Sequence, residues 1–214
     1  MTAIEPSGAE QVMPQDRDFS RRFGTALQFA NELHAAQTRK STTIPYISHL
    51  MGVASLVLEH GGSADEAIAA LLHDSVEDQA EEYPGGATSL RAYIQEAFGP
   101  AVLEIVNGCT DADTHPKPPW RERKERYVAH LATASASIRL VSCADKLHNA
   151  RAILSDLRYI GIAVFDRFTA GKEGTLWYYR QLADTFTALG PTLLAAELDR
   201  TVREIEALEV IAAS

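Results

Sequence analysis

The chain has 214 residues, 46% of them hydrophobic, which is enough to bury the core of one sizeable domain. Its formal net charge of −9 argues against nucleic acid and anionic membranes as partners, so an anionic ligand has to meet local cations or a metal ion. The absence of a run of about 18 apolar residues and of a C-x-x-C spacing excludes a membrane-spanning helix, a disulfide framework and a zinc ribbon, and favours the cytoplasm.

The periodicity of the sequence predicts an all-α protein. Residues 1–18 have neither a basic start nor an apolar segment, and we expect a disordered leader before one folded domain over residues 19–214. Within that domain apolar residues recur at three- and four-residue steps, and no alternating stretch predicts a strand. Helices are predicted over about residues 21–37, 49–60, 64–80, 89–98, 100–108, 120–134 and 137–154, with another ending near residue 169 and two terminal helices split by Gly190-Pro191.

Two helix starts are predicted from local chemistry. Pro45 forces an extended approach, and Ser48 is placed to cap a helix that opens at His49. Ser63 and Glu66 have the S-x-x-E spacing of a capping box, which opens the next helix. Because the connection between these helices is short, we expect them to be antiparallel neighbours, which can bring their far ends near each other.

The stretch ALLHDSVED, residues 70–78, places four polar side chains directly behind an apolar run. On one helix, residues four apart lie above one another, so His73 pairs with Glu77 and Asp74 with Asp78 on a single face. Adjacent His and Asp side chains can bind one divalent ion through nitrogen and oxygen, provided that other segments complete the coordination sphere. The stretch therefore predicts half of a metal site, with an acidic pair one turn away.

Two further residues are candidate ligands. His49 opens the preceding helix, and the helical neighbours of Asp145 at i−7, i−4 and i+7 are Ile138, Val141 and Ala152. The carboxylate of Asp145 therefore points where an apolar face should be, and a buried unpaired carboxylate would cost several kcal/mol. Two His and two Asp residues from three helices suit Mn²⁺, Fe²⁺, Co²⁺ or Zn²⁺ and leave two octahedral positions for a water and a phosphate oxygen.

Each candidate also has a purely structural interpretation. His49 alone fits a solvated residue at a helix start, and Glu77 with Asp78 fits an exposed acidic helix face. Asp145 alone fits an ion pair with a neighbouring Lys or Arg on its own helix. Together the residues favour a metal centre, in which Glu77 orients or deprotonates a water and Asp78 assists.

The pattern H…HD…D resembles the HD superfamily of metal-dependent phosphohydrolases. Three longer stretches narrow the resemblance: HAAQTRKSTTIPYISHLMGVA, AALLHDSVEDQ and RLVSCADKLHNAR are similar in order and spacing to the hydrolase domain of RelA/SpoT-type enzymes, which remove the 3′-diphosphate from ppGpp and pppGpp. The similarity lies mostly between Phe19 and Leu154. Because the chain ends at Ser214 and no strands follow, we expect a stand-alone small alarmone hydrolase built as a single HD-domain helical bundle.

The resemblance implies a role for each matching residue. It implies that a Mn²⁺ ion is held by His49, His73, Asp74 and Asp145. It implies that Glu77 and Asp78 activate the water, that Arg39 packs on the purine and that Lys40 faces phosphate. This division suits a planar guanidinium and a compact ammonium, although both residues also fit a loop exposed to water. The remaining matches are Asn149, which contacts the nucleoside, and Arg151, which fits a surface cation equally well.

Several functions remain open at this point. The leading hypothesis is Mn²⁺-dependent hydrolysis of guanosine alarmones to GDP or GTP and pyrophosphate, with a small-molecule nucleotide as the only expected partner and the oligomeric state undetermined. The alternatives are an adenosine alarmone, the 2′-phosphate of NADPH, and a catalytically silent module that binds a nucleotide. Five charged residues outside the matched stretches are interpreted as solvated faces, with contact to the pyrophosphate or closure over the pocket as the alternative: His115, Lys117, Arg121, Lys124 and Lys172. Trp177, Tyr178 and Tyr179 are interpreted as packing rather than as a platform for the base.

Overall fold

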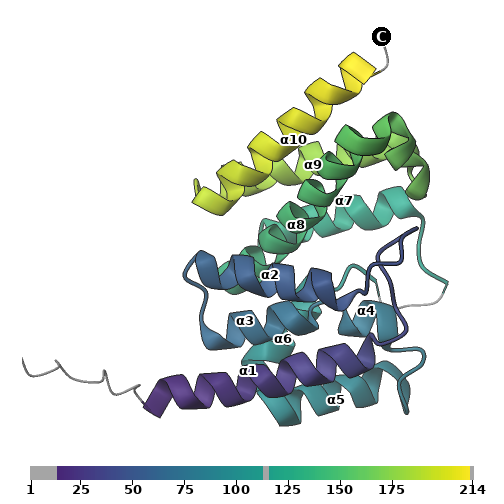
Figure 1. The fold of residues 1–214 in the computed structure, drawn as a ribbon. Coiled ribbons are helices and arrows are strands. Elements are labelled where there is room, and N and C mark those ends of the chain that lie inside the picture. The colour runs from purple at the N-terminus through teal and green to yellow at the C-terminus, as the bar shows by residue number, and fades with distance from the viewer. Residues whose placement is uncertain (1–13, 113–115, 213–214) are drawn as a thin grey trace, which may run out of the picture.

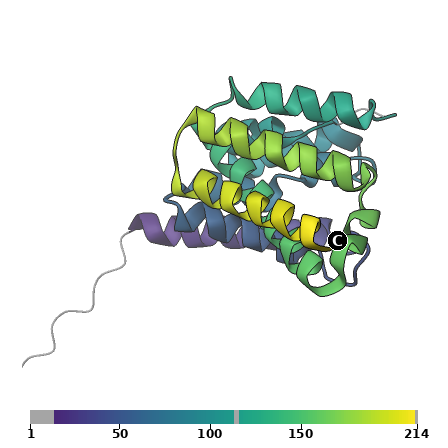
Figure 2. The same cartoon turned by 90° about the horizontal axis from the view of Figure 1, so that it is seen from above.

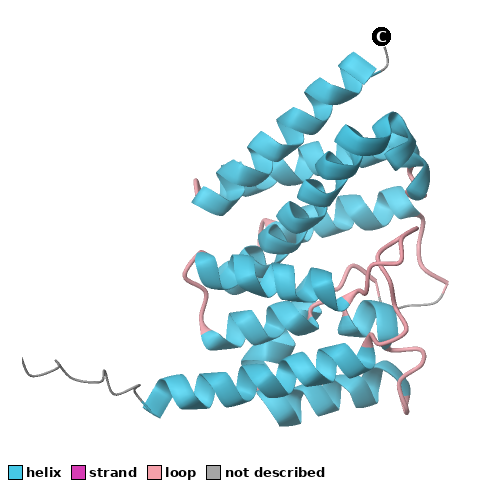
Figure 3. Ribbon diagram, viewed as in Figure 1, coloured by secondary structure: helices cyan, strands magenta, loops and turns pink. Residues whose placement is uncertain are grey.

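The computed structural model describes residues 14–112 and 116–212, and this part of the chain consists of helices joined by loops, without a named strand (Figure 3). The all-α fold class is therefore confirmed. The helices of the first half are α1 (Pro14–Leu33), α2 (Ile47–Glu59), α3 (Ala64–Leu72), α4 (Ser75–Gln79), α5 (Gly86–Phe98) and α6 (Pro100–Cys109). Those of the second half are α7 (Trp120–Leu131), α8 (Ala136–Ile160), the 3-10 helix η1 (Gly161–Arg167), α9 (Gly171–Leu189) and α10 (Leu193–Ala212).

The helices form two groups joined by α8. Figure 1 shows α1 to α6 stacked at one end of the molecule, with α7, α9 and α10 at the other. From above, α7, α9 and α10 run side by side, and α9 contacts both of its neighbours (Figure 2). Helix α8 contacts α2, α3 and α6 in the first group and α9 and α10 in the second. The buried surface of α8 therefore contacts both groups of helices.

Helix α8 is buried because its apolar residues do not keep to one stripe. Val141, Ala144, Leu147 and Ala150 are all fully buried. A helix that is apolar around most of its circumference is buried in a core, where it packs against neighbours on several sides. Asp145 lies in the middle of this run, so the fold carries its carboxylate into the interior.

The capping box that opens α3 is confirmed. The Ser63 hydroxyl accepts from the Glu66 backbone N–H, and the Glu66 carboxylate accepts from the Ser63 backbone N–H. For the preceding helix, the prediction that Ser48 is the N-cap is wrong, because α2 already begins at Ile47 without a side-chain cap. A backbone turn takes its place: the Ser48 N–H donates to the carbonyl of Pro45 at 3.1 Å.

The prediction of a disordered leader over residues 1–18 is wrong for residues 14–18. Residues 14–18 belong to α1, in line with a proline in the first turn and the acidic residues Asp16 and Asp18 near a helix N-terminus. Residues 1–13 lie outside the described residues, so a leader there stays a prediction, as does the domain boundary. Among the helices of the described ranges, none is both long and apolar enough to cross a membrane.

Candidate metal centre and substrate cavity

The stretch 70–78 is not one helix, contrary to the prediction. Helix α3 ends at Leu72, His73 is its C-cap, and α4 begins at Ser75. Asp74 between them has φ −95° and ψ −1°, which is the bridge region where turn and active-site residues are often found. On a continuous helix adjacent side chains point about 100° apart, whereas this corner lets His73 and Asp74 converge.

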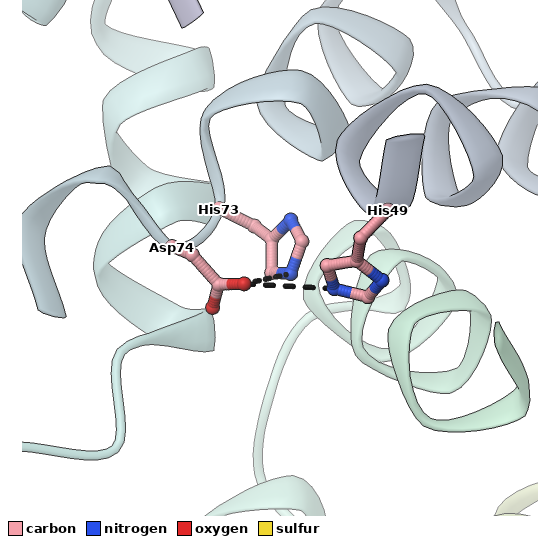
Figure 4. Close-up of side chains that lie close together, drawn as sticks. All are labelled: His49, His73 and Asp74. Carbon is pink, nitrogen blue, oxygen red and sulfur yellow. Dashed lines mark ion pairs between the residues drawn. The ribbon is translucent and has the colours of Figure 1, made fainter. Parts of the chain in front are cut away.

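The four predicted ligands come together at this corner. His49, His73 and Asp74 each offer an atom within 4.8 Å of the others (Figure 4). Asp74 Oδ2 lies 3.0 Å from His73 Nε2 and 3.6 Å from His49 Nε2. From α8, Asp145 Oδ1 lies 3.2 Å from His49 Nε2 and 3.7 Å from His73 Nε2. Three separate segments thus bring two imidazoles and two carboxylates to one point.

The outer ring nitrogens are held so that both Nε2 atoms face the centre. His73 Nδ1 lies 2.8 Å from the Ala70 carbonyl, which can only accept, so Nδ1 carries a proton. His49 Nδ1 lies 2.9 Å from Nδ1 of His148. His148 was not predicted from the sequence to belong to the site, although it follows Asp145 by three residues. Both Nε2 atoms are buried and have no hydrogen-bond partner. Buried polar atoms are seldom left unpaired, so these two point to an absent ligand.

The carboxylates give the centre its negative charge. Asp145 Oδ1 accepts from the Asn149 amide at 2.6 Å and Oδ2 from the Lys146 ammonium at 2.5 Å. Burial opposes ionisation, but the charge of Lys146 and the imidazoles outweigh it and hold the pKa of Asp145 well below its usual range. Asp74 Oδ2 accepts from the Tyr46 hydroxyl at 2.6 Å.

The imidazole of His73 shows that this centre attracts positive charge. Burial alone would lower the pKa of His73, yet the carboxylates of Asp74 and Asp145 raise it well above its ordinary value. A proton and a metal ion compete for the same nitrogen. The unpaired Nε2 atoms and the nitrogen and oxygen donors together fit a divalent transition metal.

The acidic pair lies beside the centre on α4. Glu77 turns toward the segment after α6, where it accepts from the Asp111 backbone N–H and from Lys117 Nζ, both at 3.1 Å. Asp78 accepts from the Gln37 amide at 2.8 Å. Burial, followed by the charge of Asp74, raises the pKa of Asp78 to about 6. The two carboxylates therefore have different surroundings.

The loop before α2 presents Arg39 and Lys40. Backbone bonds close it, from the Arg39 N–H to Ile44 O at 2.8 Å and from the Tyr46 N–H to Gln37 O at 3.0 Å. Arg39 donates to Asn149 Oδ1 at 2.6 Å. The loop is thus tied to α8 at a residue that also binds Asp145.

A cavity of about 470 Å³ opens beside the centre. Its lining includes Arg39, Lys40, Lys146 and Asn149, and a neighbouring cavity of about 290 Å³ includes Glu77 and Lys124. Both volumes are on the scale of ligand sites. Tyr178 and Tyr179, which were interpreted from the sequence as packing residues, also line both cavities, as does Phe168.

Other candidate residues lie elsewhere. Arg151 does not line the cavity, because its guanidinium pairs with Glu197 of α10. Arg121 stacks on Trp177, 3.2 Å from the ring centroid, which fits the packing interpretation. His115 lies outside the described residues. Lys172 is in the first turn of α9, where the sequence predicted a turn. These contacts join residues far apart in sequence, so local patterns could not predict them.

Comparison with known families agrees with this geometry. A family model described as an HD domain matches residues 26–176, which is more than half of the chain and includes the four candidate ligands. The chain belongs to the HD domain family. The matched region includes the His73-Asp74 pair at the α3–α4 corner.

Named relatives of this HD domain are pyrophosphohydrolases. Over 129 residues it is 40% identical to guanosine-3′,5′-bis(diphosphate) 3′-pyrophosphohydrolase MESH1 of Xenopus tropicalis, covering 59% of this chain and 66% of the relative. The protein of the same name from Drosophila melanogaster is 33% identical over 135 residues, covering 62% and 69%. The bifunctional (p)ppGpp synthase/hydrolase SpoT of Escherichia coli K12 is 30% identical over 150 residues, which is 67% of this chain and 19% of the relative. The chain thus spans about two thirds of the length of its animal relatives.

Solved structures share the fold. A metazoan orthologue of SpoT superposes with a TM-score of 0.68 at 24% identity, covering 85% of this chain and 94% of the other. A protein from Listeria monocytogenes superposes with a TM-score of 0.61 at 26% identity, covering 76% and 99%. These similarities confirm the HD-domain helical fold.

Removing one carboxylate should abolish metal binding. We expect Mn²⁺ at about 100 times its Kd to stabilise the metal-free protein by about 2.7 kcal/mol, seen as a rise in Tm of a few degrees. Asp145→Ala should lose this rise and retain less than a tenth of the bound metal, measured by thermal melts and elemental analysis. Asp166→Ala, at an exposed carboxylate, is the control. An equal metal content in Asp145→Ala would remove Asp145 from the ligand set.

Proposed function

We propose that this HD domain is a metal-dependent 3′-pyrophosphohydrolase of guanosine alarmones. Water attacks the phosphorus attached to the 3′-oxygen, the bond between them breaks, and (p)ppGpp becomes GDP or GTP and pyrophosphate. The names of the animal relatives support this substrate. The proposed metal is Mn²⁺, and the proposed ligands are His49, His73, Asp74 and Asp145.

A hydrogen-bonded link between the cavity and the metal centre carries the proposal. Arg39 donates to Asn149, and Asn149 donates to Asp145. The 470 Å³ cavity is lined by Tyr46, Lys146 and Asn149, each of which contacts a proposed ligand, so a nucleoside in this cavity would have its 3′-phosphate near the centre. A planar guanidinium fixed in this way suits the face of a purine. The NADPH and silent-module hypotheses would use the same link, so it is the names of the animal relatives that favour the guanosine alarmone over them.

Each residue has a chemical task. A divalent ion, when bound, supplies Lewis-acid activation of water and of the phosphate. Lys40 and Lys146 meet phosphate oxygens with their ammonium groups. Glu77 and Asp78 accept the proton of the attacking water, and the Gln37 amide holds Asp78 in place. The Tyr46 hydroxyl donates to Asp74 Oδ2 and fixes this carboxylate.

The cellular setting follows from the same chemistry. We place the protein in the cytoplasm, because its substrate is a soluble nucleotide and both Cys109 and Cys143 are buried free thiols. The expected partner is a small-molecule nucleotide. Nucleic acid is not an expected ligand for a chain of net charge −9.

A substrate panel tests the function. Metal-loaded protein is incubated with ppGpp, ppApp and NADPH, and pyrophosphate and orthophosphate are measured separately. We expect pyrophosphate from ppGpp at the highest kcat/KM. Orthophosphate from NADPH at a higher kcat/KM would give the enzyme a different substrate, and binding of ppGpp without turnover would make it a silent module.

Glu77→Gln should lower kcat by at least about 100-fold while metal content stays the same, because the amide cannot accept a proton. This variant also weakens the contact with Lys117, so Lys117→Met is the matched control: it breaks the same ion pair and keeps the carboxylate. Its kcat at saturating ppGpp should stay within about threefold of wild type. If Lys117→Met loses as much kcat as Glu77→Gln, Glu77 only positions the loop.

The pH profile should report Asp78. The pKa of Asp78 is raised to about 6, and only the ionised form accepts a proton, so activity should fall as pH drops below about 6. We expect kcat/KM to fall about tenfold per pH unit there. Asp78→Asn should be slower at every pH and should lack this limb. An unchanged limb in Asp78→Asn would assign it to another group.

A further inference from the structure

One buried hydroxyl in the cavities lacks a partner. Tyr178 on α9 is 6% exposed, and its Oη has no hydrogen bond to any described residue. A buried hydroxyl without a partner is unfavourable, and native proteins seldom keep one unless a ligand or water completes it. The remaining part of the ring packs against Trp120, with centroids 6.0 Å apart, so the side chain is held in place.

The ring of Tyr178 lies where the two cavities meet. Both cavities are lined by it, and both also include Lys40 and Lys124. Lys124 Nζ lies 5.0 Å from the centroid of the Tyr178 ring. Lys40 and Lys124 therefore line the same cavities as the Tyr178 ring, and an anionic oxygen is the group that can accept hydrogen bonds both from an ammonium group and from the O–H.

The hydroxyl stays neutral and can donate a hydrogen bond. Burial raises the pKa of Tyr178 far above the physiological range, so the proton stays on the oxygen. An O–H bond to an ionised acceptor is roughly twice as strong as a bond between neutral groups. A carbonyl or ribose hydroxyl would gain less from this position than a phosphate.

We propose that the Tyr178 hydroxyl binds a phosphate oxygen of the substrate at the junction of the two cavities. This inference rests on the proposed function for the identity of the substrate. The site takes a diphosphate group that is attached to either the 3′- or the 5′-oxygen of the nucleoside. Tyr178 lies beyond the region matched by the HD family model, which ends at residue 176. It is a substrate-binding residue and takes no part in the proton transfer.

Asp111 is an alternative acceptor, within the protein itself, for the Tyr178 hydroxyl. Asp111 Oδ1 is also buried without a partner, and the charge of Asp111 acts on Tyr178. If the hydroxyl donates to Asp111 in solution, it is a structural bond. Removing the Tyr178 oxygen then lowers stability, whereas removing an unpaired oxygen does not.

The test is Tyr178→Phe, which deletes a single oxygen. The control is Tyr127→Phe, because the Tyr127 hydroxyl is buried but donates to Ser142 at 2.9 Å. We expect Tyr178→Phe to keep or raise the Tm, and Tyr127→Phe to lower it by a few degrees. Pyrophosphate, GDP and guanosine are then titrated into each metal-loaded protein by calorimetry. These titrations need no turnover, so they remain informative if ppGpp proves not to be the substrate.

Tyr178→Phe should weaken pyrophosphate or GDP binding about tenfold and leave guanosine unchanged. Weaker pyrophosphate binding assigns the contact to the 3′-diphosphate, and weaker GDP binding assigns it to the 5′-diphosphate. Three results would overturn the proposal: unchanged affinity for both diphosphates, an equal loss for guanosine, or a fall in Tm as large as that of Tyr127→Phe.

Discussion

The structure depends on two imidazoles and two carboxylates that converge inside a helical bundle. His49, His73 and Asp145 are at most 5% exposed, although ionisable groups are unfavourable away from water. Lys146 and Asn149 satisfy the Asp145 carboxylate, whereas the two Nε2 atoms make no hydrogen bond within the described protein and face the carboxylates of Asp74 and Asp145. The fold thus holds a position of negative potential, and a cation is what completes it.

This centre also explains the corner between α3 and α4. The sequence from Ala64 to Gln79 has the periodicity of one helix, and propensity alone gives no reason to interrupt it. Adjacent side chains cannot face the same ion from a regular helix, so His73 and Asp74 require a change of backbone direction. The Tyr46 hydroxyl then fixes the carboxylate that the corner exposes. At the site the tertiary structure overrides the helical propensity of the sequence. Conflicts of this kind are expected at functional sites.

The predictions that held depend on short-range chemistry. The capping box at Ser63 and Glu66 needs only residues three apart, and the burial of Asp145 follows from its apolar neighbours on one helix. The roles that the sequence leaves open depend on a distant partner. Arg151 looks the same in sequence whether it faces a nucleotide or Glu197, which is 46 residues away. Tyr178 likewise reads as packing until its oxygen is found unpaired between two cavities.

Cations inside an acidic protein need counter-charges, and here carboxylates at and near the metal centre supply them. Lys146 pairs with Asp145, and Lys124 pairs with Asp111. Both ammonium groups belong to residues that line the larger cavity. A phosphate that enters this cavity would compete with the two carboxylates for the ammonium groups. The ion pairs that neutralise the buried carboxylates therefore also let a chain of net charge −9 present local positive charge to an anionic ligand.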